Sequence, residues 1–284
     1  MGFFTGKNLM WPDWLSSLYS EYIVDEIDRD DRSVGGTYLG WPKDRIFTDV
    51  LEGGRADFAA SHGTLSSDDR ALLYARYNQP RHLDELIEAF TTMQSGDKSR
   101  LDRCTILDLG CGPFTGGLAF AAALGADCSF RYYGVDRALS MLTLGKKLYC
   151  AAQQSNAFHE ETRCEFLAGL EQIQHERKHG RLTIVIASYL LASESFKAVD
   201  TVAQLARTLT DIGPGAVVVL YTNSVLPVRN MKFPEFSDAL IKTGFRHRAG
   251  GEGIVYGGVK NPAPLRYELF YRPEIAEISL ESKS

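Results

Sequence analysis

Long apolar runs, paired cysteines and a strong charge of one sign are all missing from this 284-residue sequence. No apolar stretch approaches the ~20 residues of a membrane-spanning helix, and the opening MGFFTGKNLM lacks the pattern of a signal peptide. The formal net charge is −5, which disfavours non-specific nucleic-acid binding, because such binding needs a basic surface. These absences predict a cytoplasmic protein with no membrane partner.

The five cysteines are odd in number, and no two have the C-x-x-C spacing of zinc sites and redox motifs. We therefore expect neither a disulfide framework nor a bound metal. His175 and His179 have the spacing of metal ligands on a helix, but no third ligand is close in sequence, so we expect them on the surface.

The pattern of apolar residues changes near residue 104. Before it, helical spacing dominates: residues 11–29 read as an amphipathic helix, and Ser66 to Asp69 supply capping groups for a helix that ends before Pro80. After it, short apolar runs alternate with helical stretches, including a charged helix expected around 171–180. Near-continuous apolar strands of this kind are typical of a parallel sheet covered on both faces.

The expected fold class is therefore α/β, with a doubly wound, mostly parallel sheet behind an N-terminal helical extension. The expected strands are CTILDLG, FRYYGVD, CEFLAGL, LTIVIASYLL and AVVVLYTN, with two more near 245–256 and 265–272, which makes seven. The division expected is a helical cap over 1–100, a ligand-binding domain over 101–273 and a tail over 274–284.

The sharpest feature is the segment ILDLGCGPFTGG at 106–117, which leaves an apolar strand and enters an Ala-rich helix. Gly110 and Gly112 allow the backbone to turn tightly and to approach a ligand where a Cβ would clash. Asp136 closes the next strand, where a carboxylate accepts hydrogen bonds from a ribose diol. Together these residues predict an adenosine-type ligand at the carboxyl ends of the strands.

The glycine spacing separates two ligand classes. A dinucleotide-binding fold has G-x-G-x-x-G, whereas three residues lie between Gly112 and Gly116 here, which disfavours a nicotinamide oxidoreductase. The run D-x-G-x-G-P resembles motif I of the Rossmann-like (class I) S-adenosylmethionine-dependent methyltransferases. Val135 and Asp136, with the Met-Leu helix that follows, resemble their second motif, and the whole resemblance covers roughly 101–273.

The resemblance implies S-adenosylmethionine as the cofactor and assigns roles by matching positions. Asp108 is expected to support the loop and the amino group of the cofactor, Asp136 to bind the ribose hydroxyls and Arg137 to lie near the adenine. In one departure, the stretch after the third strand, AGLE, has no acid where such enzymes often contact adenine. The implied cofactor-binding residues are Asp108, Gly110, Cys111, Gly112, Pro113, Asp136, Arg137 and Ser188.

No catalytic residue is identified, because the cofactor supplies the activated methyl group and the protein mainly aligns the acceptor. The expected substrate-binding residues are Tyr74, Arg76 and Tyr77, in a helix closely preceding motif I, and Tyr189, at the end of the fourth strand. Loops and extensions around a scaffold often carry specificity, so the aromatic-rich extension is a candidate cap. His82 is expected on a helix surface.

Signatures of base methylation are missing. The fourth strand ends in SYLL, where [D/N]-P-P-[Y/F] is typical of amino methylation of bases, and no Pro-Cys pair offers a thiolate for attack on a pyrimidine. A methyltransferase with a small-molecule acceptor is therefore favoured. Two alternatives stay open: a ribosome- or RNA-associated methyltransferase-like protein, faintly resembled by ALLYARYNQPRHLDEL and ASYLLAS, and a non-catalytic binding protein that retains the fold.

Overall fold

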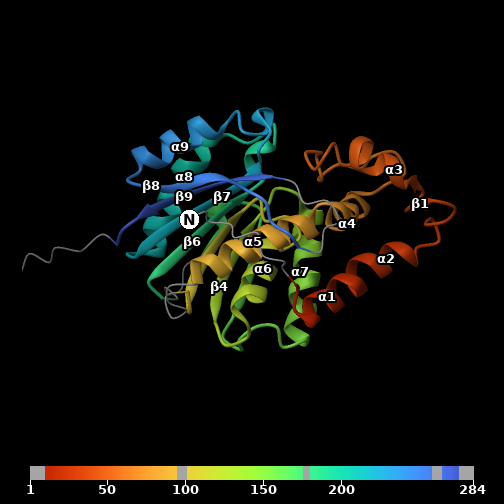
Figure 1. Ribbon diagram of the computed structural model, residues 1–284, viewed down its shortest axis with the longest axis horizontal. Coiled ribbons are helices and arrows are strands. Elements are labelled where there is room, and N and C mark those ends of the chain that lie inside the picture. The colour runs from red at the N-terminus through yellow and green to blue at the C-terminus, as the bar shows by residue number, and fades with distance from the viewer. Residues whose placement is uncertain (1–9, 95–100, 175–179, 258–263, 275–284) are drawn as a thin grey trace, which may run out of the picture.

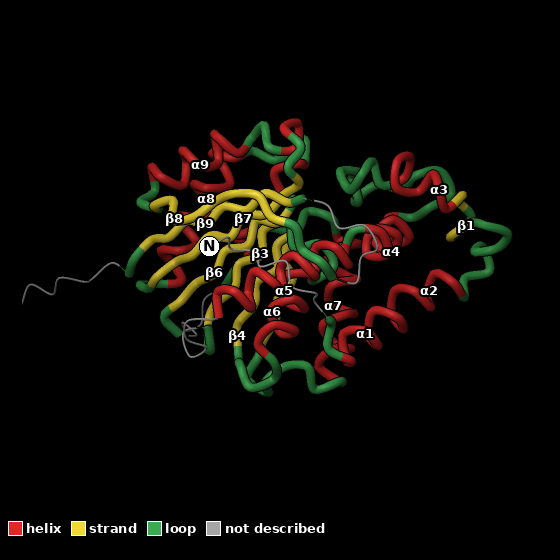
Figure 2. The backbone as a smooth tube through the Cα atoms, viewed as in Figure 1, coloured by secondary structure: helices red, strands yellow, loops and turns green. Residues whose placement is uncertain are grey.

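The computed structural model describes residues 10–94, 101–174, 180–257 and 264–274. Its centre is a seven-stranded sheet of order β5-β4-β3-β6-β7-β9-β8 (Figures 1 and 2). The neighbouring pairs from β5 to β7 are parallel, whereas β9 runs antiparallel to both β7 and β8. The strands are β3 (Cys104–Leu109), β4 (Phe130–Val135), β5 (Arg163–Leu167), β6 (Leu182–Ser188), β7 (Ala216–Ser224), β8 (Arg246–Gly253) and β9 (Leu265–Arg272). The predicted fold class is confirmed.

Successive residues of the central strands face opposite helical layers, because side chains alternate along a strand. Ile106 and Ile184 belong to one apolar cluster, whereas Leu107 and Val185 belong to another. Burial on both faces explains why these strands are continuous apolar runs in the sequence. One layer contains α5 (Gln79–Gln94), α6 (Thr115–Leu124) and α7 (Leu139–Gln154), and the other contains α8 (Ala198–Ile212) and α9 (Phe233–Lys242) (Figure 1).

The N-terminal extension is helical and packs against the first layer. Leu15, Ile23 and Ile46 are fully buried in the same apolar cluster as Ile106 of β3. The predicted helix over 11–29 forms as a continuous helical stretch that contains a π-helical turn. The elements of the extension are α1 (Asp13–Tyr19), η1 (Ser20–Val24), α2 (Asp25–Asp28), β1 (Thr37–Tyr38), β2 (Trp41–Pro42), α3 (Lys43–Arg45), η2 (Ile46–Val50) and α4 (Ser67–Tyr77).

The start of α4 is the capping box that the sequence predicts. The backbone N–H of Asp69 donates to the Ser66 hydroxyl (3.0 Å), and the backbone N–H of Ser66 donates to the Asp69 carboxylate (2.9 Å). The helix ends at Tyr77, and Pro80 lies in the first turn of α5, where its missing N–H costs no helical hydrogen bond.

Three expectations fall wholly or partly on residues that the structure does not describe. Within the predicted helix at 171–180, the described part forms only the single turn η4 (Leu170–Gln172), and His175 and His179 lie outside the described residues. The boundary at residue 100 and nearly all of the expected tail also lie outside them, so this division stays a prediction. No helix within the described ranges combines the length and the hydrophobicity needed to cross a bilayer.

Candidate functional site

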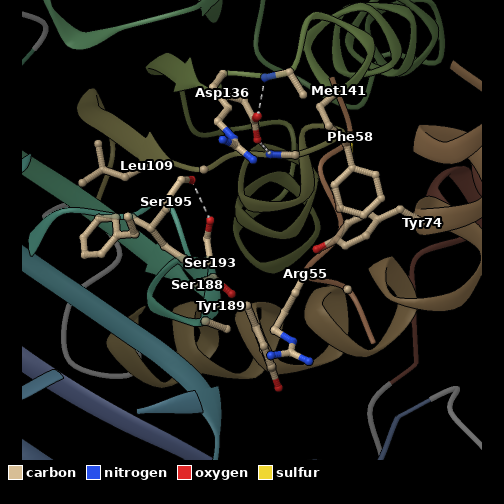
Figure 3. A pocket seen from close by; sticks show the side chains of 18 of the residues that line it. Arg55, Phe58, Tyr74, Leu109, Asp136, Met141, Ser188, Tyr189, Ser193 and Ser195 are labelled. Atoms are coloured by element: carbon tan, nitrogen blue, oxygen red, sulfur yellow. Dashed lines mark hydrogen bonds between the residues drawn. The ribbon is translucent and has the colours of Figure 1, made fainter. Parts of the chain in front are cut away.

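A cavity of about 790 Å³ opens where the carboxyl ends of the parallel strands meet the N-terminal extension (Figure 3). Ligands of open α/β sheets bind at this edge, because the loops after neighbouring strands diverge there. Both parts of the chain contribute to its walls. The lining includes residues 109–110, 112, 135–138, 141, 168–170 and 188–190 of the sheet domain and 53–56, 58, 74, 77–78 and 81–82 of the extension.

The glycine loop has the backbone that the sequence predicts. Gly110 and Gly112 have φ of 69° and 52°, the left-handed region that glycine adopts without strain. A Cβ on Gly110 would also lie 2.9 Å from Cδ1 of Leu190. The backbone N–H of Gly110 donates to the carbonyl of Val135 (2.8 Å), which joins the loop to the end of β4. Both glycines line the cavity.

Asp136 holds the glycine loop and faces the cavity at the same time. One carboxylate oxygen accepts the backbone N–H of Gly112 (3.1 Å), and the other accepts that of Ala138 (2.9 Å) (Figure 3). Burial raises the pKa of this carboxyl above its usual value, against the lowering effect of these two hydrogen bonds. Each oxygen has further acceptor capacity, so hydroxyl groups of a ligand can bind here.

Asp108 instead points behind the loop and does not line the large cavity. Only 3% of it is exposed, and its carboxylate accepts a hydrogen bond from the Tyr132 hydroxyl (2.7 Å). Gly116 leaves the space for it, since a Cβ there would overlap this carboxylate and lie 2.8 Å from Ile186. Burial raises the pKa of Asp108 to about 7, and the Tyr132 hydrogen bond lowers it. Asp108 therefore supports the loop from within the protein.

The other predicted cofactor residues divide between cavity and core. Arg137 and Ser188 line the cavity, and Arg137 makes an ion pair with Asp57 (3.2 Å) at its exposed rim. Cys111 and Pro113 do not line it: the Cys111 side chain is buried behind the loop, and the Pro113 carbonyl accepts a hydrogen bond from a glutamine of α5. Both residues belong to the glycine loop, but they do not face the large cavity.

The predicted substrate residues also divide. Tyr74, Tyr77 and Tyr189 line the cavity, but Arg76 does not, which corrects its expected place in the site. Residues 74 and 77 are three apart and share a face of α4, whereas residue 76 is rotated away from that face. Arg76 instead lies over the ring of Tyr38, inside the extension (6.0 Å).

His82 lines the cavity, so the prediction that it lies on a helix surface is wrong. Only 7% of it is exposed, and its ring stacks on Tyr189 with 3.9 Å between the ring centroids and 20° between the planes. The Tyr74 hydroxyl lies 3.3 Å from its Nδ1. Burial lowers the pKa of His82 to about 3, so the imidazole is neutral at pH 7. Tyr74, His82 and Tyr189 together form an aromatic wall of the cavity.

A buried carboxyl, Glu85, positions this wall from behind. The Tyr189 hydroxyl donates to Glu85 Oε1 (3.1 Å), and Arg81 Nε donates to the same oxygen (2.7 Å). Glu85 is only 2% exposed, and burial raises its pKa to about 7, although Arg81 and Tyr189 lower it. Tyr189 itself has φ of 56°, a strained value for a tyrosine, directly after β6.

We expect Glu85→Gln to change the pH dependence of stability. Between pH 4.5 and 7 the folded state holds a proton on Glu85 that the unfolded chain has released, so the stability contribution falls as pH rises. From pH 5 to pH 7, the free energy of unfolding of the wild type should fall by about 2 kcal/mol more than that of Glu85→Gln. Denaturant unfolding at both pH values measures this; Asp108 and His82 titrate in both proteins and cancel. Parallel pH curves for the two proteins would contradict it.

The outer part of the cavity carries basic side chains. Arg55 comes from the extension, Lys197 precedes α8, and Arg229 lies in η6 (Pro227–Arg229), after β7. Lys232 Nζ stabilises the segment after η5 (Leu190–Ala192), because it donates to the carbonyls of residues 193, 194 and 196 at 2.7–2.9 Å. In the described part of the chain, no three His, Cys, Asp or Glu side chains gather closely enough to hold a metal ion.

Comparison with known proteins gives a match in structure only. No family model matches the chain, and no curated protein matches its sequence. Similar solved structures include an arsenic (III) S-adenosylmethionine methyltransferase from Chlamydomonas reinhardtii, with 13% identity, TM-score 0.42, and 68% of this chain and 74% of that chain covered. Another is a geranyl diphosphate C-methyltransferase from Streptomyces coelicolor, with 11% identity, TM-score 0.42, and coverage of 78% and 88%.

A third similar structure is an S-adenosylmethionine-dependent methyltransferase from Methanosarcina mazei, with 12% identity, TM-score 0.41, and coverage of 62% of this chain and 95% of that chain. Structural similarity this low does not establish an activity. The strand order and directions of the sheet show by themselves a doubly wound, mostly parallel seven-stranded fold.

Proposed function

We propose that the protein is an S-adenosylmethionine-dependent methyltransferase with a small-molecule acceptor. The observation that carries the proposal is the Asp136 carboxylate, which binds the N–H of Gly112 and faces a cavity between the strand ends and the helical extension. At about 790 Å³, the cavity falls within the ~300–1,000 Å³ of ligand pockets.

The residues at the inner end of the cavity fit the cofactor. Asp136 has acceptor capacity for both ribose hydroxyls, and the Cβ-free edge of Gly110 and Gly112 admits the methionine part. The turn after β5 lines the cavity with three uncharged residues, Ala168, Gly169 and Leu170. These groups suit an adenine ring, so an acid is not needed for that contact.

The residues at the outer end suit alignment of the acceptor. The bound cofactor supplies an activated methyl group, and transfer requires the acceptor atom in line with it. Tyr74, His82 and Tyr189 offer flat aromatic surfaces for this, and the hydrogen bond from Tyr189 to Glu85 fixes one of them. With a pKa near 3, His82 stays neutral at pH 7 and does not keep a proton taken from the methyl acceptor.

Calorimetric titration with S-adenosylmethionine and with S-adenosylhomocysteine tests the proposal. Both ligands should bind, and NAD should not. Transfer of a labelled methyl group, screened over small acids, amines, thiols and phenols and over ribosomal RNA, then identifies the acceptor class. Absence of binding by both sulfur ligands would refute the proposal, and methylation of RNA alone would favour the RNA-associated alternative.

A second candidate is a binding protein that retains the cofactor but transfers nothing. The low pKa of His82 and the position of Glu85 behind Tyr189 favour it, because His82 is then a weak base and Glu85 does not line the cavity. Cofactor binding without any methylated product across the screen would support this candidate. The cytoplasmic location belongs to either proposal, since all five cysteines are free.

A further inference from the structure

We propose that the acceptor carries an anionic group, a phosphate or a carboxylate, and that Arg55 and Arg229 bind it at the outer end of the cavity. The inference rests on the proposed function and adds the substrate class. The two arginines line the same cavity from different parts of the chain: Arg55 from the N-terminal extension and Arg229 from the turn after β7.

Neither arginine has its charge neutralised by the protein. Among the described residues, no carboxylate lies at ion-pair distance from either guanidinium, and Arg229 only approaches the carbonyl of Gly53 (3.5 Å). The other two lining arginines are paired, Arg81 with Glu85 and Arg137 with Asp57. The Arg229 guanidinium lies beside the loop that carries Arg55, since a Cβ on Gly53 would lie 2.9 Å from one of its nitrogens. Burial and then the like charge of Arg55 lower the pKa of Arg229. A bound anion relieves this repulsion.

Hydrogen bonds fix the turn that carries Arg229. The Tyr221 hydroxyl donates to Asn230 Oδ1 (2.6 Å), and the Asn230 amide donates to the carbonyls of Ser224 (2.7 Å) and Leu226 (2.9 Å). A buried side chain also holds the carbonyl of Arg229 itself, because Asn223 Nδ2 donates to it (2.9 Å). The arginine is therefore presented by a rigid turn, which lowers the entropic cost of binding.

The loop that carries Arg55 is fixed in the same way. Arg70, which is 3% exposed, donates to the carbonyls of Val50 (2.8 Å), Asp57 (2.7 Å) and Ala60 (2.8 Å), on both sides of Arg55. In Figure 3 the Arg55 side chain points toward Tyr189 and away from Asp136. The cationic pair thus lies beside the aromatic wall, at the acceptor end.

The charge of the cavity is opposite to that of the chain. With Arg81 and Arg137 already paired, the lining keeps three basic side chains, Arg55, Lys197 and Arg229, against two acids, Asp136 and Asp200, in a protein of net charge −5. A lining with this excess of basic groups attracts anions to the site. Two guanidinium forks suit phosphate or carboxylate oxygens, which they bind through paired hydrogen bonds.

The test uses full-length protein and two probes, inorganic pyrophosphate and succinate, titrated in the presence and absence of S-adenosylhomocysteine. We expect at least one probe to bind wild type, about tenfold more weakly to Arg55→Gln and to Arg229→Gln, and not measurably to the double variant. Arg207→Gln is the matched control: it removes the same charge from an exposed position of α8 that does not line the cavity, and it should bind like wild type. The probe that binds distinguishes phosphate from carboxylate.

Affinity for S-adenosylhomocysteine should be equal in all these proteins. If neither probe binds wild type, or if the double variant binds as tightly as wild type, the anion site is refuted. A drop in S-adenosylhomocysteine affinity in the double variant would also overturn it, because the arginines would then serve the cofactor's carboxylate. If wild type binds no S-adenosylhomocysteine but binds a probe through both arginines, the proposed function fails and the anion site stands.

Discussion

Asp136→Ala is expected to weaken binding of S-adenosylhomocysteine about a hundredfold. The substitution removes the acceptor for two ribose hydroxyls, and at about 1.5 kcal/mol for each of these hydrogen bonds the loss is about 3 kcal/mol. It also leaves the backbone N–H groups of Gly112 and Ala138 without their carboxylate partner, which loosens the loop against the end of β4. Titration calorimetry measures the affinity directly.

Asp57→Asn is the matched control for this variant. It removes an acidic charge at the rim of the same cavity, but its side chain pairs with Arg137 and does not line the cavity. We expect its affinity to stay within about twofold of wild type, since exposed ion pairs contribute little. Unchanged affinity in Asp136→Ala would remove Asp136 from the cofactor site, and thermal unfolding without ligand separates loss of binding from loss of fold.

Arg70→Met is expected to lower the free energy of unfolding by about 4 kcal/mol, because three hydrogen bonds from a charged donor are lost. Methionine fills similar space but donates nothing, so the carbonyls of Val50, Asp57 and Ala60 lose the guanidinium donor, and the Asp57 carbonyl keeps the backbone N–H of Ala60 (3.2 Å). Denaturant-induced unfolding at pH 7 checks the change, with the m-value compared between variants.

Arg207→Met serves as the control for the Arg70 substitution, since it makes the same change on the exposed surface of α8. It should alter stability by less than about 0.5 kcal/mol. Equal stabilities of the two variants would show that the loop from residue 50 to 60 holds its shape without Arg70. A stable Arg70→Met protein that still binds anionic probes as wild type does would give the same conclusion.

Local chemistry in the sequence was enough to predict the sheet and the inner end of the cavity. Strands buried on both faces are apolar throughout, so β3, β6 and β7 were visible as runs. Gly110 and Gly112 were recognisable because only glycine adopts their backbone without strain, and Asp136 because it ends the next strand. Each of these signals is a pattern of a few neighbouring residues.

The acceptor end depended on contacts between distant segments. Helix α5 has an ordinary amphipathic pattern. Its polar side is nevertheless buried, because Trp11 Nε1 donates a hydrogen bond to Asp84 Oδ1 (2.6 Å) and the Tyr189 hydroxyl donates one to Glu85. That burial is why His82 became a cavity residue instead of a surface one. A helical period predicts which face is apolar and says nothing of what covers the other face.

By itself, the sequence determined the parallel sheet, the glycine loop with Asp136 and the capping box of α4, because backbone geometry and side-chain alternation are local properties. Only the tertiary structure decided that Arg76 turns into the extension while Arg55 and Arg229 meet at one cavity. Arg55 and Arg229 lie far apart along the chain, and no spacing rule relates residues that meet only when the extension packs on the strand ends.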